Sequence, residues 1–211
     1  MKLLVGLAGA GVAVLAGFGG WSLWLLKGSP DDIDGLVREL GVGAGAVVAD
    51  VGAGSGSWAV RLAEIVGPGG RVYATELPGR LDGLRELARS EAGDTLVVVE
   101  AGPTATGLDA ACCDAIVMRG VYHHFDDGAE MNRQLLVALR PGGRLAIVDF
   151  APDGPWRWHF WFLGGSHGGR RGHGVHLAEI ARDAEAAGGR VVRQVAGWSG
   201  GYHLTVVERP E

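Results

Sequence analysis

The sequence lacks the features that mark several common classes of protein. Its two cysteines, Cys112 and Cys113, are adjacent, so they can neither join distant segments by a disulfide nor supply the spaced ligands of a zinc site. There is no basic excess, because the net charge is −5 and the pI is about 5.8, which argues against a general nucleic-acid binder. The 38 glycines follow no Gly-X-Y period, which excludes collagen, and no internal repeat is present.

Charge is also missing from a long stretch near the N-terminus. Residues 3–26 contain no charged side chain, and Lys2 and Lys27 flank them. As a helix this segment would extend about 36 Å, enough to cross a hydrocarbon core of about 30 Å. Trp21 and Trp24 lie near one end, where indole rings favour the membrane interface. We therefore predict a single-pass transmembrane anchor over residues 1–28, followed by one domain over residues 29–211.

A cleaved signal peptide is the alternative interpretation of this segment. The uncharged run is longer than the apolar core of a usual signal peptide, about 7–15 residues, and no convincing A-x-A cleavage site ends it. The two flanking lysines leave the orientation open. With an uncleaved anchor we expect a membrane protein whose domain is cytoplasmic, on the side of the membrane where its cofactor would be made. With a cleaved signal the protein would be exported.

Beyond residue 28 the hydrophobic pattern alternates between strands and helices. Continuous apolar runs such as 96–99 and 145–148 are typical of strands that are buried on both faces. The predicted strands are 47–51, 71–77, 96–100, 115–118, 144–150, 191–198 and 202–208, and the predicted helices are 33–40, 57–66, 81–91, 128–139 and 175–187. This order predicts an α/β fold with a Rossmann-like, doubly wound, mostly parallel seven-stranded sheet. The last two strands have no helix between them, which predicts an antiparallel hairpin at the C-terminal edge.

The most informative stretch is the glycine-rich turn at residues 50–56, which reads Asp-Val-Gly-Ala-Gly-Ser-Gly between a predicted strand and a predicted helix. Glycine has no Cβ and tolerates a positive φ, so such a turn lets a nucleotide approach the backbone closely. Glu76 ends the next strand, at the edge where open α/β sheets bind ligands, and an acid there can accept hydrogen bonds from both ribose hydroxyls. A dinucleotide-binding G-x-G-x-x-G loop would need glycine at position 57, where this sequence has Ser57.

The turn resembles the first motif, D/E-x-G-x-G-x-G, of class I S-adenosylmethionine-dependent methyltransferases. Residues 139–145 are similar to the L-x-P-G-G turn of the same superfamily, and residues 121–125 (Val-Tyr-His-His-Phe) resemble its branch of quinone-biosynthesis and other small-molecule enzymes. The resemblance implies S-adenosylmethionine as cofactor, packed on the glycines with its ribose at Glu76. The cofactor-binding residues that we infer are Asp50, Gly52, Ala53, Gly54, Gly56, Glu76, Leu77, Ala101, Gly102 and Arg119.

One departure from the family pattern follows the third strand. Many relatives carry an acid or a small polar residue there that contacts adenine, whereas this sequence reads Glu100, Ala101, Gly102, Pro103. We therefore expect the backbone around Ala101 and Gly102 to contact the adenine. For Arg119 or Gly120 we also favour a contact with the cofactor through the backbone.

Methyl transfer from a sulfonium is an in-line displacement of a good leaving group, to which a protein contributes mainly by alignment and exclusion of water. A base is needed only when the acceptor must lose a proton. His123 and His124 are the candidate catalytic residues, because histidine titrates near neutral pH. Alternatively, one is a structural histidine and the other lines the pocket without proton transfer. No acid pair accompanies them at ligand spacing, so we expect no metal.

An aromatic stretch at residues 155–162 (Pro-Trp-Arg-Trp-His-Phe-Trp-Phe) follows the fifth predicted strand. In this family that connection usually borders the acceptor pocket. It could form a hydrophobic pocket or a membrane-facing lip for a lipid-like acceptor, or a lid packed on the core. The glycine-rich residues 166–174 that follow suggest a loop able to close over an acceptor, whose arginines suit acidic groups. Our candidate substrate residues are Tyr122, His123, Trp158, Trp161, Arg171 and His173.

Together these features predict a membrane-anchored, S-adenosylmethionine-dependent methyltransferase that acts on a small or lipid-like acceptor. One alternative is a module that binds S-adenosylmethionine without catalysis. The other is an NAD(P)-dependent oxidoreductase, which Ser57 disfavours.

Overall fold

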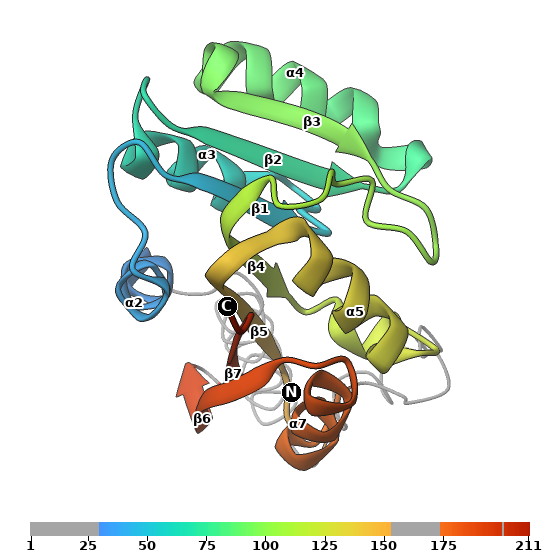
Figure 1. The fold of residues 1–211 in the computed structure, drawn as a ribbon. Helices are drawn as coiled ribbons and strands as arrows, with labels where there is room; N and C mark the ends of the chain where they lie inside the picture. Colours follow the sequence, from blue (N-terminus) through green and yellow to red (C-terminus); the bar gives the residue numbers. More distant parts are fainter. Residues whose placement is uncertain (1–29, 153–173, 200) are drawn as a thin grey trace, which may run out of the picture.

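The computed structural model describes residues 30–152, 174–199 and 201–211. The predicted anchor at residues 3–26 and the candidate residues Trp158, Trp161, Arg171 and His173 lie outside these ranges. Within them, no helix combines the length and apolar character needed to cross a membrane. The described chain forms one twisted sheet with helices on both faces (Figure 1).

The sheet has seven strands in the order β3-β2-β1-β4-β5-β7-β6. The first five strands in the chain pair in parallel, and β7 is antiparallel to both of its neighbours, which confirms the predicted fold and its C-terminal hairpin. The strand order reverses between β1 and β4, where ligands bind in open α/β sheets. The strands are β1 (Val47–Val51), β2 (Arg71–Glu76), β3 (Leu96–Glu100), β4 (Cys113–Arg119), β5 (Leu139–Phe150), β6 (Arg190–Ser199) and β7 (Tyr202–Glu208).

The helices divide the core into two layers. On one face α2 (Pro30–Leu40), α3 (Ser57–Val66) and α4 (Leu81–Glu91) cover the sheet, and on the other face α5 (Gly128–Ala138) and α7 (Leu177–Ala186) do so. Alternate strand residues supply the two layers, since Val48 and Val117 pack with the first and Ala49 and Ile116 with the second. Strands buried on both sides explain the continuous apolar runs of the sequence.

Several element boundaries differ from the sequence prediction, and hydrogen bonds explain two of them. β5 begins at Leu139 rather than Arg144, because the turn before it hydrogen-bonds the end of the chain: Arg209 N donates to Gly143 O and Gly142 N donates to Arg209 O, both at 2.9 Å. α7 begins at Leu177 rather than Val175, because Val175 N donates to Phe150 O and is held beside the sheet.

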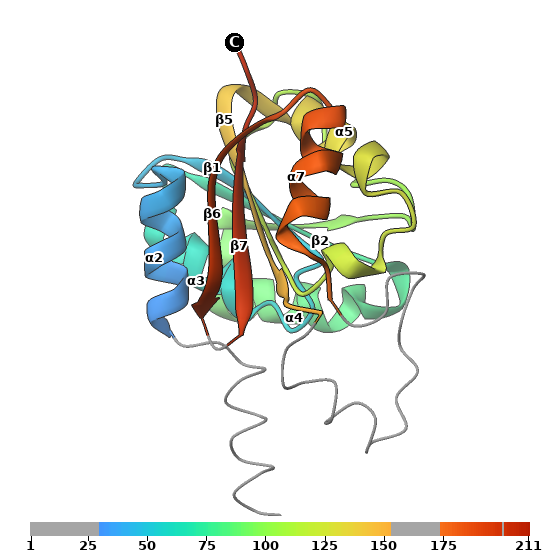
Figure 2. The same cartoon turned by 90° about the horizontal axis from the view of Figure 1, so that it is seen from below.

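The helix α2 runs antiparallel to β5 (Figure 2). Near its C-terminal end, Arg144 Nη1 donates to Glu39 O at 3.0 Å, and Arg144 lies where β5 begins its regular pairing with β4. Near its N-terminal end, Asp32 lies within electrostatic range of Tyr202, which pairs with Phe150 at the end of β5. Burial raises the pKa of Tyr202 to about 12, and the charge of Asp32 is among those that add to the shift. The N-terminus of α2 therefore lies at the carboxyl edge of the sheet.

Candidate functional site

The glycine turn after β1 adopts left-handed backbone at all three glycines, with φ of 72° at Gly52, 56° at Gly54 and 76° at Gly56. A Cβ on Gly52 would lie 2.6 Å from Val121, and one on Gly56 would lie 2.6 Å from Leu84 and Leu87. A Cβ on Gly54 would meet only a backbone oxygen at 3.9 Å. Gly52 and Gly56 are thus required by packing, whereas Gly54 leaves space at the surface of the turn.

Hydrogen bonds from β2 hold this turn in place. Gly52 N and Ala53 N both donate to Thr75 O at 3.0 Å, and Gly54 N donates to Glu76 Oε2 at 2.8 Å. The other carboxylate oxygen of Glu76 accepts from Leu77 N at 2.9 Å. Each carboxylate oxygen can accept a second hydrogen bond, so Glu76 can hold the turn and a pair of ribose hydroxyls together.

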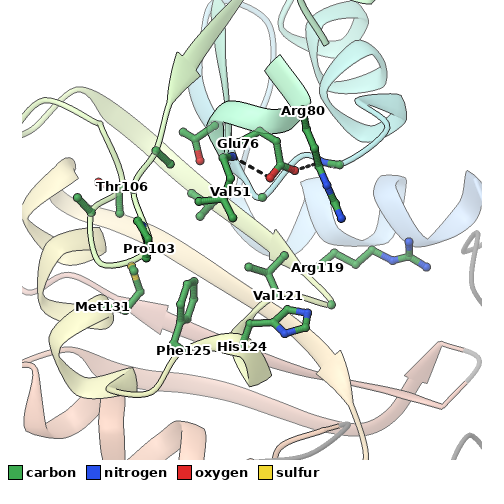
Figure 3. A pocket seen from close by; sticks show the side chains of 18 residues that line it. Val51, Glu76, Arg80, Pro103, Thr106, Arg119, Val121, His124, Phe125 and Met131 are labelled. Carbon is green, nitrogen blue, oxygen red and sulfur yellow. Dashed lines mark hydrogen bonds between the residues drawn. The ribbon is translucent and has the colours of Figure 1, made fainter. Parts of the chain in front are cut away.

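A cavity of about 600 Å³ opens at this edge of the sheet, within the usual range for a small-molecule site. Figure 3 shows Glu76 and Arg80 on one side of it and Phe125 and Met131 on the other. Most of the remaining lining residues contribute apolar side chains or backbone atoms. The lining residues are Val51, Gly52, Gly54, Thr75, Glu76, Leu77, Arg80, Ala101, Gly102, Pro103, Ala105, Thr106, Arg119, Gly120, Val121, His124, Phe125 and Met131.

Asp50 and Arg119 place opposite charges beside this cavity. Asp50 is 3% exposed, and burial raises the pKa of its carboxyl from 3.8 to about 7, opposed by the charge of Arg119 and supported by that of Glu76. The guanidinium of Arg119 lies 5.1 Å from the ring centroid of Trp58 and 4.6 Å from that of Tyr202. Among the described residues, Asp50 Oδ2 and Arg119 Nη2 are buried atoms with no hydrogen-bond partner.

The two histidines after β4 have different environments. His124 lines the cavity. His123 is buried, with Nδ1 2.8 Å from Asp149 Oδ1, and its backbone N donates to Asp149 Oδ2 at 3.0 Å. The two imidazole centroids are 4.0 Å apart. His123 therefore fixes the connection between β4 and α5 and supports His124, and it does not line the cavity.

The structure brings most of the predicted cofactor residues to this edge of the sheet. Leu77, Ala101, Gly102 and Arg119 line the cavity, whereas Ala53 packs toward the α3 side of the core. The backbone N–H groups of Ala101 and Gly102 donate to Glu76 O and Ala105 O, both at 2.9 Å. These N–H groups are thus used within the protein. At position 119 it is the side chain of Arg119 that has a buried atom without a hydrogen-bond partner.

Tyr122, which we predicted at the substrate, lies in the core instead. It is fully buried, its hydroxyl donates to Asp183 Oδ2 at 3.2 Å, and it accepts from Asn132 Nδ2 at 2.9 Å. The sequence interpretation also missed lining residues. Val51 lies within the recognised motif and Val121 and Phe125 lie in the histidine segment, whereas Met131 comes from an ordinary helical pattern that carries no signal.

Comparisons with known proteins agree with this geometry. Residues 49–147 match the family model described as a methyltransferase domain. The chain is 35% identical over 132 residues to a protein-L-isoaspartate O-methyltransferase of Aeropyrum pernix, and the matched region covers 59% of this chain and 46% of the relative. It is 29% identical over 122 residues to a ubiquinone/menaquinone biosynthesis C-methyltransferase of Hahella chejuensis, which covers 56% of this chain and 49% of the relative.

Residues 49–147 are identified as a methyltransferase domain of the class I, S-adenosylmethionine-dependent type. The chain spans about half the length of the curated relatives that it matches. A solved S-adenosylmethionine-dependent methyltransferase from Aquifex aeolicus has the same fold, with a TM-score of 0.70 at 23% identity over 87% of this chain and 95% of that chain. S-adenosylmethionine is the methyl donor of this methyltransferase family.

The residues of this methyltransferase domain fit that cofactor. Gly54 leaves open space at the turn, and Glu76 retains acceptor capacity for a ribose. The unpartnered atoms of Asp50 and Arg119 match the ammonium and carboxylate of its amino-acid end.

Proposed function

We propose that the protein transfers the methyl group of S-adenosylmethionine to a small, lipophilic acceptor, and that its N-terminal segment anchors it to a membrane with the domain on the cytoplasmic side. The observation that carries the proposal is the cavity, where the glycine turn and Glu76 adjoin an apolar wall. The bound cofactor supplies an electrophilic methyl on sulfur: the S–CH₃ bond breaks as the acceptor forms its bond to carbon, and a neutral thioether leaves.

The contribution of this chain is mainly binding and alignment. Gly54 and Glu76 would hold the nucleoside of the cofactor, and Asp50 and Arg119 would hold its amino-acid end. A reaction that spreads positive charge over sulfur, carbon and acceptor gains little from an added acid, and positioning accounts for most of the rate. The apolar wall excludes water from the reacting atoms.

The lining opposite Glu76 supports a lipophilic acceptor. This wall is formed by Pro103, Val121, Phe125 and Met131. Apolar surface of a ligand that becomes buried against it contributes about 25 cal/mol per Å² to binding. His124 lies beside Phe125 in this lining, and its imidazole is placed to take a proton if the acceptor must lose one. Asp149 holds His123 in place beneath it.

Cofactor binding tests this proposal directly. Isothermal titration of the full chain in detergent with S-adenosylmethionine should show one site, and NAD(H) should show none. Gly54→Val should abolish binding, because its side chain would enter the open space at the turn. Gly43→Val is the matched control, since Gly43 is exposed, has no positive φ and has nothing within 4 Å of an added Cβ. Binding of NAD(H) in place of S-adenosylmethionine would refute the proposal.

The acceptor is then sought with cofactor carrying a labelled methyl group. Soluble and lipid extracts are offered separately to the unchanged chain and to Gly54→Val. Label that enters only the lipid extract, and only with the unchanged chain, supports the lipophilic acceptor. Label confined to water-soluble products contradicts it.

A further inference from the structure

The carboxyl edge of the sheet carries both the cavity and the point where the described chain begins. The cavity is lined from the ends of β1, β2 and β4, at Val51, Glu76 and Arg119. The helix α2 begins at Pro30 on the same edge, because it runs antiparallel to β5 and Glu39, near its C-terminal end, accepts a hydrogen bond from Arg144, where β5 begins its regular pairing with β4 (Figure 2). The opening of the cavity and the N-terminus of α2 therefore lie on the same side of the molecule.

The chain between the uncharged segment and α2 is short. Leu26 is the last residue of the uncharged run, and only Lys27, Gly28 and Ser29 separate it from Pro30. Four fully extended steps span at most about 14 Å. The 11 residues of α2 extend about 16 Å along the sheet. A tether of this length holds the carboxyl edge, and not the opposite edge, close to the place where the uncharged segment ends.

The rim on the α2 face of the sheet has a composition suited to a lipid surface. Leu77 is 47% exposed, an unusual exposure for a large apolar side chain in this domain, and it is followed by the exposed turn Pro78–Arg80. Arg80 presents a guanidinium that suits phosphate headgroups. The acids Asp126 and Asp127 of this edge lie before α5, on the other face of the sheet, and Asp127 caps α5. On the α2 face the exposed Asp82, in the first turn of α4, is paired with Arg85 at 3.3 Å.

We propose that the carboxyl edge is the membrane-facing surface of the protein, so that the cavity opens toward the lipid headgroups and takes its acceptor from the bilayer. This inference rests on the membrane anchoring in the proposed function. It assigns the acceptor to the amphiphiles, with an apolar part that stays in lipid and a nucleophilic head that reaches the cavity. Such an acceptor reaches the site by diffusion in the membrane plane rather than from water.

Two glycines give matched positions for a probe on opposite edges. Gly79 lies at the carboxyl edge and Gly43 follows α2 at the amino edge; both are exposed, lack positive φ and have nothing within 4 Å of an added Cβ. Gly79→Cys and Gly43→Cys are each labelled with a maleimide fluorophore in the full chain. Cys113 is buried, and its burial raises the pKa of its thiol, so labelling of the unchanged chain measures the background from Cys112.

The labelled chains are reconstituted into phosphatidylcholine vesicles with and without a lipid that carries a nitroxide on its headgroup. Contact quenching is short-ranged compared with the length of α2, about 16 Å, so the label on Gly79→Cys should lose about threefold more of its fluorescence than that on Gly43→Cys. Equal quenching of the two labels, or stronger quenching on Gly43→Cys, would overturn the inference.

Flotation on a density gradient separates this result from a failure of the proposed function. Chains that do not float with the vesicles refute the anchoring itself. Chains that float, bind S-adenosylmethionine and show equal or reversed quenching refute only the orientation of the cavity. Chains that float and show selective quenching of Gly79→Cys support both.

Discussion

Asp50 should make cofactor affinity depend on pH close to neutrality. Burial raises the pKa of its carboxyl to about 7 in the free protein, so at that pH about half of the molecules carry a proton there. The ammonium and sulfonium charges of S-adenosylmethionine favour the ionised carboxylate, so binding should lower this pKa and release the proton. Protonation and cofactor binding therefore oppose each other, and affinity should fall as the pH falls below 7.

The size of the effect follows from the shift. If the pKa drops to about 5 or lower in the complex, the fraction of ionised Asp50 in the free protein controls the apparent Kd between pH 6 and pH 8. That fraction changes about tenfold over this interval, equivalent to about 1.4 kcal/mol of binding free energy. The apparent Kd at pH 6 should thus be about tenfold weaker than at pH 8.

Calorimetric titration at pH 6, 7 and 8, in two buffers with different ionisation enthalpies, measures both the affinity and the proton release. Near pH 7 the proton released per cofactor bound should be about one half. Asp50→Asn should bind more weakly, show no such release and lose the pH dependence. A pH dependence that persists in Asp50→Asn, or an absence of proton release in the unchanged chain, would refute this role for Asp50.

Three further substitutions test other parts of the site. Arg119→Gln should weaken S-adenosylmethionine by about 10- to 100-fold, the loss expected of a charge-assisted hydrogen bond of about 1.5–3 kcal/mol, while 5′-methylthioadenosine, which has no carboxylate, should bind unchanged in the same titration. Tyr122→Phe removes a hydroxyl that is hydrogen-bonded to Asp183 and Asn132, so it should lower the unfolding free energy by about 1–3 kcal/mol, as measured by urea melts. A change in cofactor affinity in this variant would contradict the place of Tyr122 in the core. Gly56→Ala should destabilise the protein by about 2–4 kcal/mol through its left-handed backbone and its clash with α4, and a urea midpoint equal to that of the unchanged chain would rule this out.

The carboxyl of Asp50, which we place at the cofactor, also opposes folding. An aspartate whose folded pKa is raised binds its proton more tightly in the folded state, so stability falls as the pH rises from about 4 to about 7. The shift from 3.8 to about 7 corresponds to about 4 kcal/mol, since each unit is about 1.4 kcal/mol. Asp50→Asn should therefore be more stable than the unchanged chain at pH 8, although it should bind the cofactor more weakly.

The strand ends and the glycine turn could be predicted because local chemistry determines them. The run at residues 145–148 of β5 is apolar throughout since both faces of that strand are buried. Positive φ at Gly54 and Gly56 restricts these positions to glycine whatever the rest of the chain does. Glu76 ends β2 and so lies at the carboxyl edge as soon as the sheet is parallel. These features need no knowledge of distant contacts.

The features that the sequence did not reveal depend on contacts between distant residues. His123 and His124 are neighbours in the chain, and only the approach of Asp149, 26 residues away, decides which one is held in the core. Tyr122 lies beside them in the motif, but the short 3-10 turn that contains these three residues directs its ring toward α5 and α7. Hydrophobic periodicity describes which residues are buried, not which partner they meet.

The position of β7 has a consequence for the order in which the domain can form. β7 is the last strand in the chain, but it lies inside the sheet, between β5 and β6. Until it is made, β5 has an open edge, and the core lacks Leu204 and Val206. A nascent chain therefore contains every strand that lines the cavity well before it can close the sheet. A chain interrupted anywhere before Tyr202 presents that unpaired edge to its neighbours, which makes incomplete synthesis a route to aggregation.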